Sequence, residues 1–287
     1  MSRKENAALL LNEHANIFIC PVCGGKVEVV DHKSMICSNR HTFDFAKQGY
    51  INMLTRSMKV NYDKELFAAR QRIIMKHNLY DPLHRRLLEV IQAETERHSR
   101  ALLLDAGAGE GSHLTKTLDQ KEGSVTGIGI DISKEGIRLA ASKCDTVMWL
   151  VGDLANIPIK NDAIHVIINI LSPANYQEFK RVLAENGLMI KVVPGKNYLI
   201  ELREAILDER KHSFTNEETI SLFKQHFSDV KTEELTYTKS LNQAELNDLI
   251  KMSPLSWNAD KESINNLRKR EQFEITIDLS ILIGKNR

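Results

Sequence analysis

The stretch that decides the fold of this chain is ALLLDAGAGEGSHLTKTL, residues 101–118. Its apolar start, residues 101–104, is typical of a buried strand, and Asp105 ends that strand. Three glycines then alternate with other residues before a helical pattern begins at Ser112: Gly107, Gly109 and Gly111. A strand, a glycine-rich turn and a helix in this order bring the backbone close to a ligand at the carboxyl end of a parallel sheet. The stretch therefore predicts an α/β fold with a ligand site at this turn.

The residues between the glycines indicate the charge of the ligand. Dinucleotide-binding turns carry the fingerprint G-x-G-x-x-G. The spacing here is G-x-G-x-G, with acidic residues at Asp105 and Glu110. Two acids favour a ligand with a cationic end, such as S-adenosylmethionine, over an anionic pyrophosphate. An unspecific Rossmann-like fold is the alternative interpretation of the glycines and acids.

Acids at the ends of the next two strands strengthen the prediction of S-adenosylmethionine. The predicted strand 124–131 ends in Asp131, which lies 26 residues after Asp105. An acid at the tip of a second strand can accept hydrogen bonds from both hydroxyls of a ribose. The predicted strand 146–151 is followed by Asp153, which we expect near the amino group of an adenine. Three acids, each at a strand end, are typical of this cofactor.

The pattern from residue 101 to residue 193 predicts a doubly wound parallel sheet. Apolar runs at 163–171 and 188–193 predict a fourth and a fifth strand. Residues 175–187 predict a helix that stops at Gly187. We expect strands and helices to alternate throughout this region, with a helix in every crossover.

Further elements flank this sheet. A helix with Asp81 as its N-cap and Pro82 at its first position is expected before it, ending near residue 98. The elements expected after it are a helix at 215–226 with Thr215 and Glu218 as a capping box, a strand at 229–239, a helix at 242–251 and a strand at 273–284. A helix inserted before a final, antiparallel strand is typical of methyltransferase sheets.

A cysteine cluster near the start of the chain predicts a zinc site. Its ligands would be Cys20 and Cys23, then Cys37 and His41 after thirteen intervening residues. Three thiolates and one imidazole suit tetrahedral Zn²⁺, and four protein ligands make the site structural. The strand-like segments 26–30 and 34–37, joined by a turn at residues 31–33, predict a zinc ribbon.

Other interpretations of the cluster remain open at this point. The cysteines could be ordinary buried residues, or Cys20 and Cys23 could be a redox pair, although a redox motif normally lies in a βαβ context. His32 could replace His41 as the nitrogen ligand. Cys144 is distant in sequence and is expected only to pack.

Composition limits the class of protein. The chain has 287 residues, of which 42% are hydrophobic and 27% charged, as in soluble globular proteins. The apolar run at residues 7–11 is too short for a secretory signal, and no apolar stretch approaches the length of a membrane helix. We therefore expect a cytosolic protein, where cysteine clusters more often bind metal than form disulfides.

The net charge of +1 conceals an uneven distribution. Residues 1–100 carry 16 Lys and Arg against 11 Asp and Glu, whereas the remainder carries 23 against 27. A basic N-terminal third suggests that a polyanion would meet this end of the chain. The basic residues that could contact phosphates, or simply be solvated, are Lys26, Lys33, Arg40, Lys47, Arg56 and Lys59.

Together these residues resemble a known family, the bacterial 23S ribosomal RNA guanine-N1 methyltransferases. The resemblance covers nearly the whole chain. Its motifs are CPVC and ICSNRH in the cysteine cluster, TFDFAKQGYINML (42–54), Arg70, Y-x-P-L from Tyr80, LDAGAGEG, IGIDISK, VVPGKNYLIEL (192–202) and MSPLSW (252–257). An N-terminal ribbon combined with this sheet is much more specific than either part.

The resemblance implies a domain order and a set of site residues. A zinc ribbon that recognises RNA would occupy residues 1–60, a helical connector 61–100, and a Rossmann-like class I methyltransferase domain 101–287. The turn glycines and the three strand-end acids would bind S-adenosylmethionine together with Glu110, as would Tyr80, Asn197 and Tyr198. Tyr80 has a hydrophobic-staple role as its alternative, and Asn197 and Tyr198 could equally be a turn residue and a packing aromatic. The family also implies a homodimer whose cleft could hold an RNA hairpin.

The predicted reaction is methylation of guanine N1 in a hairpin of 23S rRNA. A base methylated at a Watson–Crick nitrogen must be unpaired or flipped out. The segment NILSPANY (169–176) lacks the Asn/Asp-Pro-Pro-aromatic motif of amino-methyltransferases, which argues against methylation of an exocyclic amine. We expect residues 172–175 to face the substrate, with Asn175 able to bind a base edge. His165 is expected to be a core histidine, and no residue is assigned as the general base.

Two other functions remain compatible with the sequence. The sheet alone would fit a methyltransferase that acts on a small molecule such as a quinone, although this leaves the ribbon unexplained. A non-enzymatic RNA-binding protein with a vestigial sheet is the second alternative. The acids at all three strand ends argue against a sheet that has lost its cofactor site.

Overall fold

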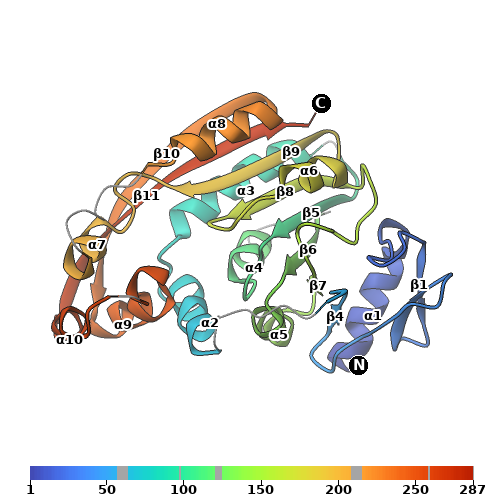
Figure 1. Cartoon of the computed structure of the whole chain (residues 1–287), viewed down its shortest axis with the longest axis horizontal. Coiled ribbons are helices and arrows are strands. Elements are labelled where there is room, and N and C mark those ends of the chain that lie inside the picture. The colour runs from blue at the N-terminus through green and yellow to red at the C-terminus, as the bar shows by residue number, and fades with distance from the viewer. Residues whose placement is uncertain (57–63, 97, 120–124, 208–214, 258, 287) are drawn as a thin grey trace.

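The computed structural model describes residues 1–56, 64–96, 98–119, 125–207, 215–257 and 259–286. Its centre is an eight-stranded sheet with the spatial order β10-β11-β9-β8-β5-β6-β7-β4 (Figure 1). In chain order the strands are β4 (Tyr50–Asn52), β5 (Ala101–Ala106), β6 (Val125–Asp131), β7 (Met148–Val151), β8 (Ile164–Ile170), β9 (Leu183–Pro194), β10 (Ser228–Asn242) and β11 (Gln272–Lys285). The five strands predicted between residues 101 and 193 are therefore confirmed.

The directions of the strands follow the predicted scheme. Strands β4 to β9 pair with one another in parallel. Strand β11 lies between β9 and β10 and is antiparallel to both, as expected for the last strand of a methyltransferase sheet. The parallel strands bring their carboxyl ends to one edge, where ligands bind in open α/β sheets.

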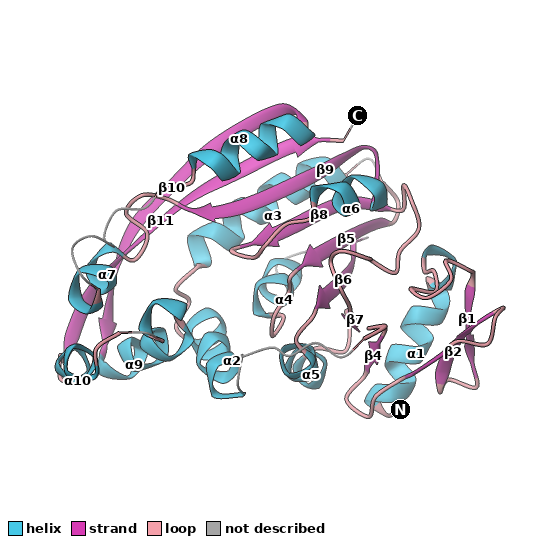
Figure 2. Ribbon diagram, viewed as in Figure 1, coloured by secondary structure: helices cyan, strands magenta, loops and turns pink. Residues whose placement is uncertain are grey.

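Both faces of the sheet are covered. Along β5, Leu103 belongs to one buried cluster, and Leu102 and Leu104 belong to the other, because successive side chains point to opposite faces. The first face is covered by α3 (Asp81–Thr95), α4 (Ser112–Asp119), α5 (Lys134–Lys143), α7 (Ile200–Ile206), α9 (Gln243–Met252) and α10 (Lys261–Arg268). The second is covered by α1 (Arg3–Glu13), α6 (Tyr176–Val182) and α8 (Glu217–His226). In Figure 2, α6 and α8 pass in front of the sheet and α3 passes behind it.

Three predicted helix ends are wrong. Helix α6 ends at Val182 rather than at Gly187, because the next residue, Leu183, already pairs with Ile164 in the sheet. Tyr80, not Asp81, is the N-cap of α3. Helix α8 has no capping box, since its N-cap is Asn216. The hydroxyl of the preceding residue, Thr215, instead accepts the backbone N–H of Glu217 at 3.4 Å.

The crossover from β7 to β8, residues 152–163, contains no helix, contrary to the prediction of a helix in every crossover. Ile157 and Ile159 alternate along it, both fully buried, as in an extended segment. The N-terminal segment covers this part of the sheet instead. Phe18 forms an antiparallel bridge with Ile159, and it belongs to the same buried cluster as Met148 of β7.

The segment before the main sheet forms the predicted ribbon. Strands β1 (Val27–Val30), β2 (Ser34–Cys37) and β3 (Thr42–Asp44) make an antiparallel three-stranded sheet. The expected turn is confirmed: Asp31 and His32 both have positive φ, and Lys33 N donates to Val30 O at 2.9 Å. Beyond the ribbon, β4 joins the edge of the main sheet beside β7. The expected boundary between residues 60 and 61 lies outside the described residues.

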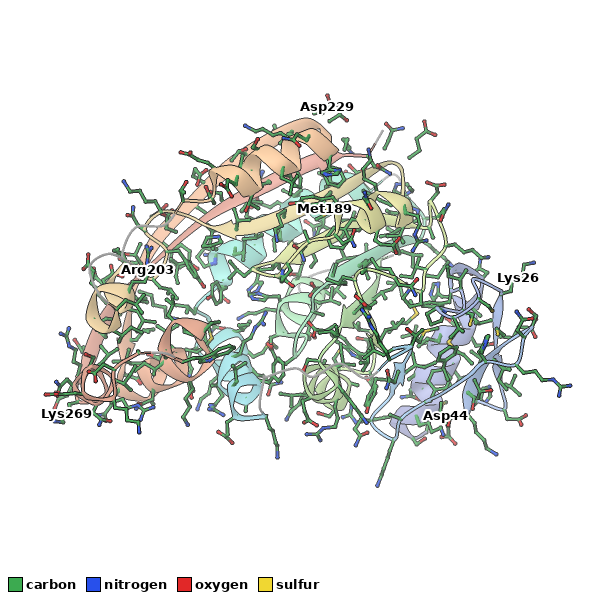
Figure 3. All side chains as sticks on the ribbon, in the orientation of Figure 1. Lys26, Asp44, Met189, Arg203, Asp229 and Lys269 are labelled. Atoms are coloured by element: carbon green, nitrogen blue, oxygen red, sulfur yellow. The ribbon has the colours of Figure 1, made fainter. Side chains whose placement is uncertain are left out.

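Helix α2 (Lys64–Gln71) leads through a π-helical turn (Arg72–Lys76) to α3. It contacts α5 and α9, and thus stands over the carboxyl ends of β5 and β6. The middle of the sheet is fully buried, as at Met189 of β9 (Figure 3). Among the described residues, none of the helices has both the length and the apolar character needed to cross a bilayer.

Candidate cofactor and zinc sites

The glycine turn after β5 requires glycine on steric grounds. Gly107, Gly109 and Gly111 all have positive φ. A Cβ atom on Gly107 would overlap the hydroxyl of Ser172, and one on Gly111 would lie 2.8 Å from the Cβ of Ala140. The turn therefore lies in direct contact with the loop after β8 on one side and with α5 on the other.

Asp131, at the end of β6, binds the same turn. Its Oδ2 accepts the N–H of Gly109 at 2.8 Å, and its Oδ1 accepts the N–H of Ser133 at 2.7 Å. Burial raises the pKa of the Asp131 carboxyl, although these two backbone donors oppose the shift. The structure thus brings together the turn and the acid that were predicted to share a ligand.

Two further acids, Asp105 and Glu110, and one arginine lie at the turn. The Nε of Arg70, on α2, lies 3.2 Å from Oε2 of the fully buried Glu110 side chain. This contact lacks hydrogen-bond geometry, and among the described residues neither Glu110 oxygen accepts a hydrogen bond. Burial alone would lower the pKa of Arg70, but the charges of Glu110 and Asp131 outweigh it and the pKa is raised. A Cβ on Gly109 would lie 3.0 Å from Arg70 Nη1, so the guanidinium stands directly over the turn.

Sequence reasoning gave Arg70 no role, although it quoted the residue as part of the family resemblance. The available signal was its position beside the apolar residues of α2. Leu66, Phe67 and Ala69 are buried, so the neighbouring arginine is drawn towards the sheet. A half-buried cation among three acids is a site where a zwitterionic ligand can exchange ion pairs with the protein.

Asp105 should make the stability of the ligand-free protein depend on pH. Burial raises the pKa of its carboxyl to about 8, against 3.8 for an ordinary aspartate. The native state then holds one proton more than the unfolded state between these values, so stability falls as pH rises from about 4 to 8. Between pH 5 and 8, we expect the free energy of unfolding of wild type to fall by about 2–4 kcal/mol more than that of Asp105→Asn. Urea unfolding across this range tests it, and parallel curves for the two proteins would contradict it.

Tyr80 and Tyr198, both predicted to bind the cofactor, contact each other. The hydroxyls of Tyr80 and Tyr198 lie 2.6 Å apart, and the ring of Tyr80 packs edge-on against His113 of α4 at 5.3 Å. Asn197 is exposed in the turn after β9, where its backbone N–H donates to Asp278 at 2.8 Å. Of the pair Asn197 and Tyr198, therefore, it is Tyr198 that reaches Tyr80.

Asp153 follows β7, at the same edge of the sheet as Asp105 and Asp131. Its Oδ1 accepts the N–H of Ala155 at 2.9 Å, which forms a tight turn. Its Oδ2 lies 3.8 Å from the Nη2 of Arg56. Arg56 follows β4, so the segment that leaves the ribbon reaches the expected adenine position.

The loop after β8 is held from beneath by a polar pair that sequence reasoning missed. The buried ammonium of Lys191 donates to Asn169 Oδ1 and to the backbone oxygen of Ser172. Asn169 Nδ2 in turn donates to Ala106 O at 2.5 Å. Burial lowers the pKa of Lys191 to about 8. The signal was a polar residue near the carboxyl end of each of two apolar strands, at positions that are paired in the register of β8 and β9.

Two other expectations concern this part of the sheet. Asn175 Oδ1 accepts the N–H of Glu178 at 3.2 Å as the N-cap of α6, so its oxygen already has a structural role. His165 Nδ1 accepts the N–H of Leu102 at 3.1 Å, and its ring packs against His98 at 4.4 Å. His165 is thus a satisfied structural histidine, as expected.

The ribbon brings the four predicted metal ligands together. The ligand atoms of Cys20, Cys23, Cys37 and His41 all lie within 4.8 Å of one another. Cys23 Sγ lies 3.7 Å from Cys37 Sγ, and His41 Nδ1 lies 3.3 Å from Cys37 Sγ. A tetrahedral zinc site with Zn–S bonds of about 2.3 Å has ligand separations of roughly 3.5–3.8 Å, so these residues fit the ion. His32, in the exposed hairpin turn, is outside this group.

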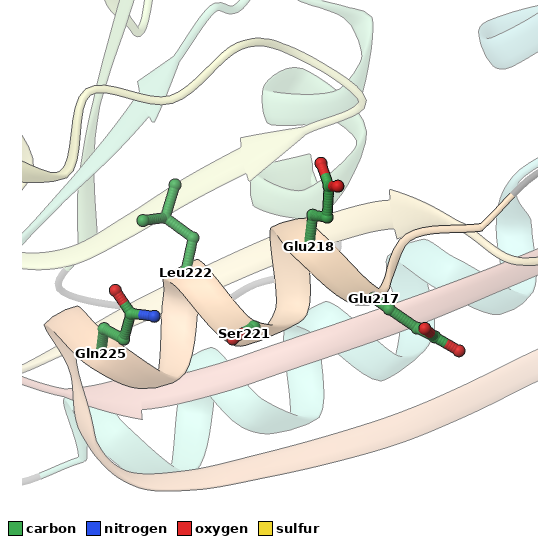
Figure 4. Close-up of a pocket in the computed structure, with 5 residues that line it drawn as sticks. All are labelled: Glu217, Glu218, Ser221, Leu222 and Gln225. Atoms are coloured by element: carbon green, nitrogen blue, oxygen red, sulfur yellow. The ribbon is translucent and has the colours of Figure 1, made fainter.

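A hollow on the outer surface of α8 is separate from both sites. It is lined by Glu217, Glu218, Ser221, Leu222 and Gln225, all from this one helix (Figure 4). Helix α8 packs against β10 and β11 at the opposite end of the sheet from β6 and β7. The hollow contains none of the predicted site residues.

Comparison with known proteins agrees with this geometry. Residues 18–59 match the family described as "RlmA, N-terminal", a zinc ribbon, and residues 103–187 match the family described as "Methyltransferase domain". A Bacillus subtilis (strain 168) protein, YxjB, named as a candidate 23S rRNA (guanine-N1-)-methyltransferase, is 38% identical over 273 residues, which cover 94% of this chain and 97% of that protein. The 23S rRNA (guanine(748)-N1)-methyltransferase of Streptomyces fradiae is 29% identical over 246 residues, or 85% and 87% of the two chains.

These matches establish the reaction class and both cofactors. The chain combines a class I, S-adenosylmethionine-dependent methyltransferase domain with a zinc ribbon that carries three cysteines and one histidine. Because it is similar to YxjB over almost its entire length, this chain belongs to the family of 23S rRNA (guanine-N1-)-methyltransferases.

Proposed function

We propose that this chain methylates N1 of a specific guanine in a hairpin of 23S rRNA, with S-adenosylmethionine as the methyl donor. The observation that carries the proposal is the union of a glycine turn, with its strand-end acids, and a zinc ribbon in one chain. The relatives that share both parts are named for this reaction. A methyltransferase for small molecules would leave the ribbon without a purpose.

Different residues at the turn would bind different parts of the S-adenosylmethionine donor. The ammonium group of the methionine part would lie near Asp105 and Glu110, and its carboxylate would replace Glu110 as the partner of Arg70. Asp131 would accept the ribose hydroxyls, and Asp153 would lie near the adenine amino group. The turn glycines 107, 109 and 111 would let the backbone approach the ligand, and the remaining contacts would come from Tyr80, Tyr198 and the neighbouring Asn197.

The ribbon would present the RNA to this site. In the proposal, Cys20, Cys23, Cys37 and His41 hold one structural zinc ion, which supplies fold rather than chemistry. Lys26, Lys33, Arg40 and Lys47 are all exposed on the ribbon, and Lys26 lies at its outer edge (Figure 3). Such cations can bind phosphates. Arg56 is engaged with Asp153 in the structure, and Lys59 lies outside the described residues.

The loop after β8 would face the target base. Ser172 touches the glycine turn, so this loop adjoins the place where the methyl group would be presented. The buried Lys191 and Asn169 hold its backbone in position, which suits a reaction in which the enzyme mainly aligns donor and acceptor. Because N1 is a Watson–Crick atom, the guanine would enter unpaired.

The proposal includes the domain division 1–60, 61–100 and 101–287, a cytoplasmic location and a homodimer. The family resemblance is what supports the last two. Light scattering of the purified protein with and without an RNA hairpin would measure the oligomeric state.

The experiment that tests the proposed function uses tritiated S-adenosylmethionine and 23S rRNA that lacks the modification. We expect label in the RNA and a primer-extension stop at one guanine, because a methyl group on N1 blocks base pairing. Replacement of that guanine by adenine in a hairpin transcript should abolish labelling. Digestion to nucleosides should give 1-methylguanosine as the labelled product.

Three outcomes would contradict the proposal. Label at a base that causes no primer-extension stop would move the methyl group to another atom. Labelling of no RNA by a protein that binds S-adenosylhomocysteine would favour the small-molecule methyltransferase. Failure to bind S-adenosylhomocysteine at all would favour the non-enzymatic RNA-binding protein.

A further inference from the structure

The first cysteine pair of the zinc site touches the turn that follows β7. Asn156 Nδ2 donates to the backbone oxygen of Pro21 at 2.9 Å. Pro21 lies between Cys20 and Cys23, in the segment that would wrap the ion. A residue of the β7–β8 crossover is therefore hydrogen-bonded to the zinc-binding loop itself.

The same turn carries the acid proposed for the adenine. Asn156 N donates to Asp153 O at 3.0 Å, and Ala155 N donates to Asp153 Oδ1 at 2.9 Å. Asn156 thus uses its backbone to shape the turn around Asp153 and its side chain to attach the turn to the ribbon. One residue connects the two sites.

Residues before and after the cysteine cluster form backbone hydrogen bonds with the chain on either side of this turn. Before the cluster, Ile19 N donates to Pro158 O at 3.1 Å. After it, Met53 N donates to Val151 O at 2.8 Å. The turn from 152 to 157 lies between these two attachments, and it has no crossover helix to support it. The N-terminal segment therefore supports this turn together with α6, from which Glu178 and Arg181 bind the backbone of Ile157 at 2.9 and 2.8 Å.

The direction of the Pro21 carbonyl depends on how the cysteine loop is closed. Within that loop, Gly24 N donates to Cys20 O and Cys20 N donates to Gly25 O, both at 2.8 Å. Cys20 is buried, whereas Cys23 is exposed to solvent. A zinc ion bound by both cysteines would hold the exposed Cys23 close to the buried Cys20. It would thereby also fix the Pro21 carbonyl, which accepts the hydrogen bond from Asn156.

We propose that Asn156 is a positioning residue that couples zinc binding by the ribbon to S-adenosylmethionine binding by the sheet. This inference rests on the proposed cofactor site. The ribbon then has a second role besides any contact with RNA, because it sets the adenine side of the cofactor pocket. Coupling between two binding sites is reciprocal, so the cofactor must strengthen zinc binding by the same factor.

The test uses the intact protein and two readouts. Calorimetry measures the Kd for S-adenosylhomocysteine, and equilibrium competition with a chromophoric chelator measures zinc affinity with and without S-adenosylhomocysteine. Asn156→Ala removes the contact with Pro21. Asn161→Ala is the matched control, because Asn161 lies in the same crossover but contacts Arg181 of α6, at 3.1 Å.

In wild type, we expect saturating S-adenosylhomocysteine to tighten zinc binding about three- to tenfold, the range for one hydrogen bond. Asn156→Ala should reduce this factor to near one and should weaken S-adenosylhomocysteine binding by a similar factor. Asn161→Ala should retain the coupling. Both variants keep their zinc ligands, and circular dichroism of each chelated protein, at a temperature below its unfolding transition, checks that the zinc-free form compared in the competition is folded.

An equal tightening of zinc binding in wild type and Asn156→Ala would overturn the inference, as would no tightening in wild type. Both results are distinguishable from failure of the proposed function. If the proposed function failed, the zinc-loaded wild type would not bind S-adenosylhomocysteine at all.

Discussion

Replacement of Cys37 by serine is expected to release zinc and to destabilise the whole protein, not only the ribbon. Cys37 is buried, and its sulfur lies within 3.7 Å of both Cys23 Sγ and His41 Nδ1. The ribbon packs Phe18 and Met35 into the same buried cluster as Ile130 of the main sheet. Because a structural zinc site contributes folding energy directly, we expect a loss of several kcal/mol of stability.

Cys144 provides the matched control for this experiment. It is the only cysteine of the chain outside the cluster, and its sulfur lies 3.3 Å from the hydroxyl of Thr146. Atomic absorption should find one zinc per chain in wild type and Cys144→Ser, and none in Cys37→Ser. Thermal unfolding followed by circular dichroism should show a lower Tm only for Cys37→Ser. Full zinc content in Cys37→Ser, or zinc loss without a change in Tm, would refute this expectation.

Asp131→Asn is expected to weaken binding of S-adenosylhomocysteine about 100-fold or more. The carboxylate receives the N–H groups of Gly109 and Ser133 on opposite oxygens, so it both shapes the turn and lies where a ribose would bind. An amide can accept through only one of its two positions and faces a backbone donor with its own NH₂ group. Loss of about 3 kcal/mol of charge-assisted hydrogen bonding corresponds to this factor.

The control for Asp131→Asn is the same substitution at Asp145. Asp145 is exposed, and its contact with Asn6 is 3.4 Å long. Calorimetry should give the wild-type Kd for Asp145→Asn, and both variants should have wild-type zinc content. A Kd for Asp131→Asn within about threefold of wild type would place the ribose elsewhere.

Both sites could be predicted because each lies within a short, sterically demanding stretch of sequence. Gly107 and Gly111 have neighbours too close for any side chain, so their pattern reports the turn directly. The cysteine spacing similarly determines a loop that can enclose one ion. His32, the alternative ligand in the middle of the linker, is exposed in the hairpin turn and outside the group of four.

The features that could not be predicted depend on partners far away in the chain. Arg70 lies beside buried apolar residues of α2, which indicates that it faces the sheet, but its partner Glu110 is far along the chain and could not be identified. Helix α6 stops early because β9 begins to pair at Leu183. The missing crossover helix is replaced by residues near Phe18, more than a hundred positions earlier. In each case tertiary pairing overrode a reasonable local pattern.

The enclosure of the β7–β8 crossover by the N-terminal segment also has a consequence for synthesis of the chain. Helix α1 and the ribbon leave the ribosome first, but the strands that cover their apolar side, β6 and β7, follow about a hundred residues later. At about 5–20 residues per second, the apolar side waits roughly 5–20 s for its partner. The apolar side of the ribbon is therefore exposed on the nascent chain during this interval, and zinc or a chaperone would protect it. The main sheet is complete only when β11, the last strand, inserts between β9 and β10.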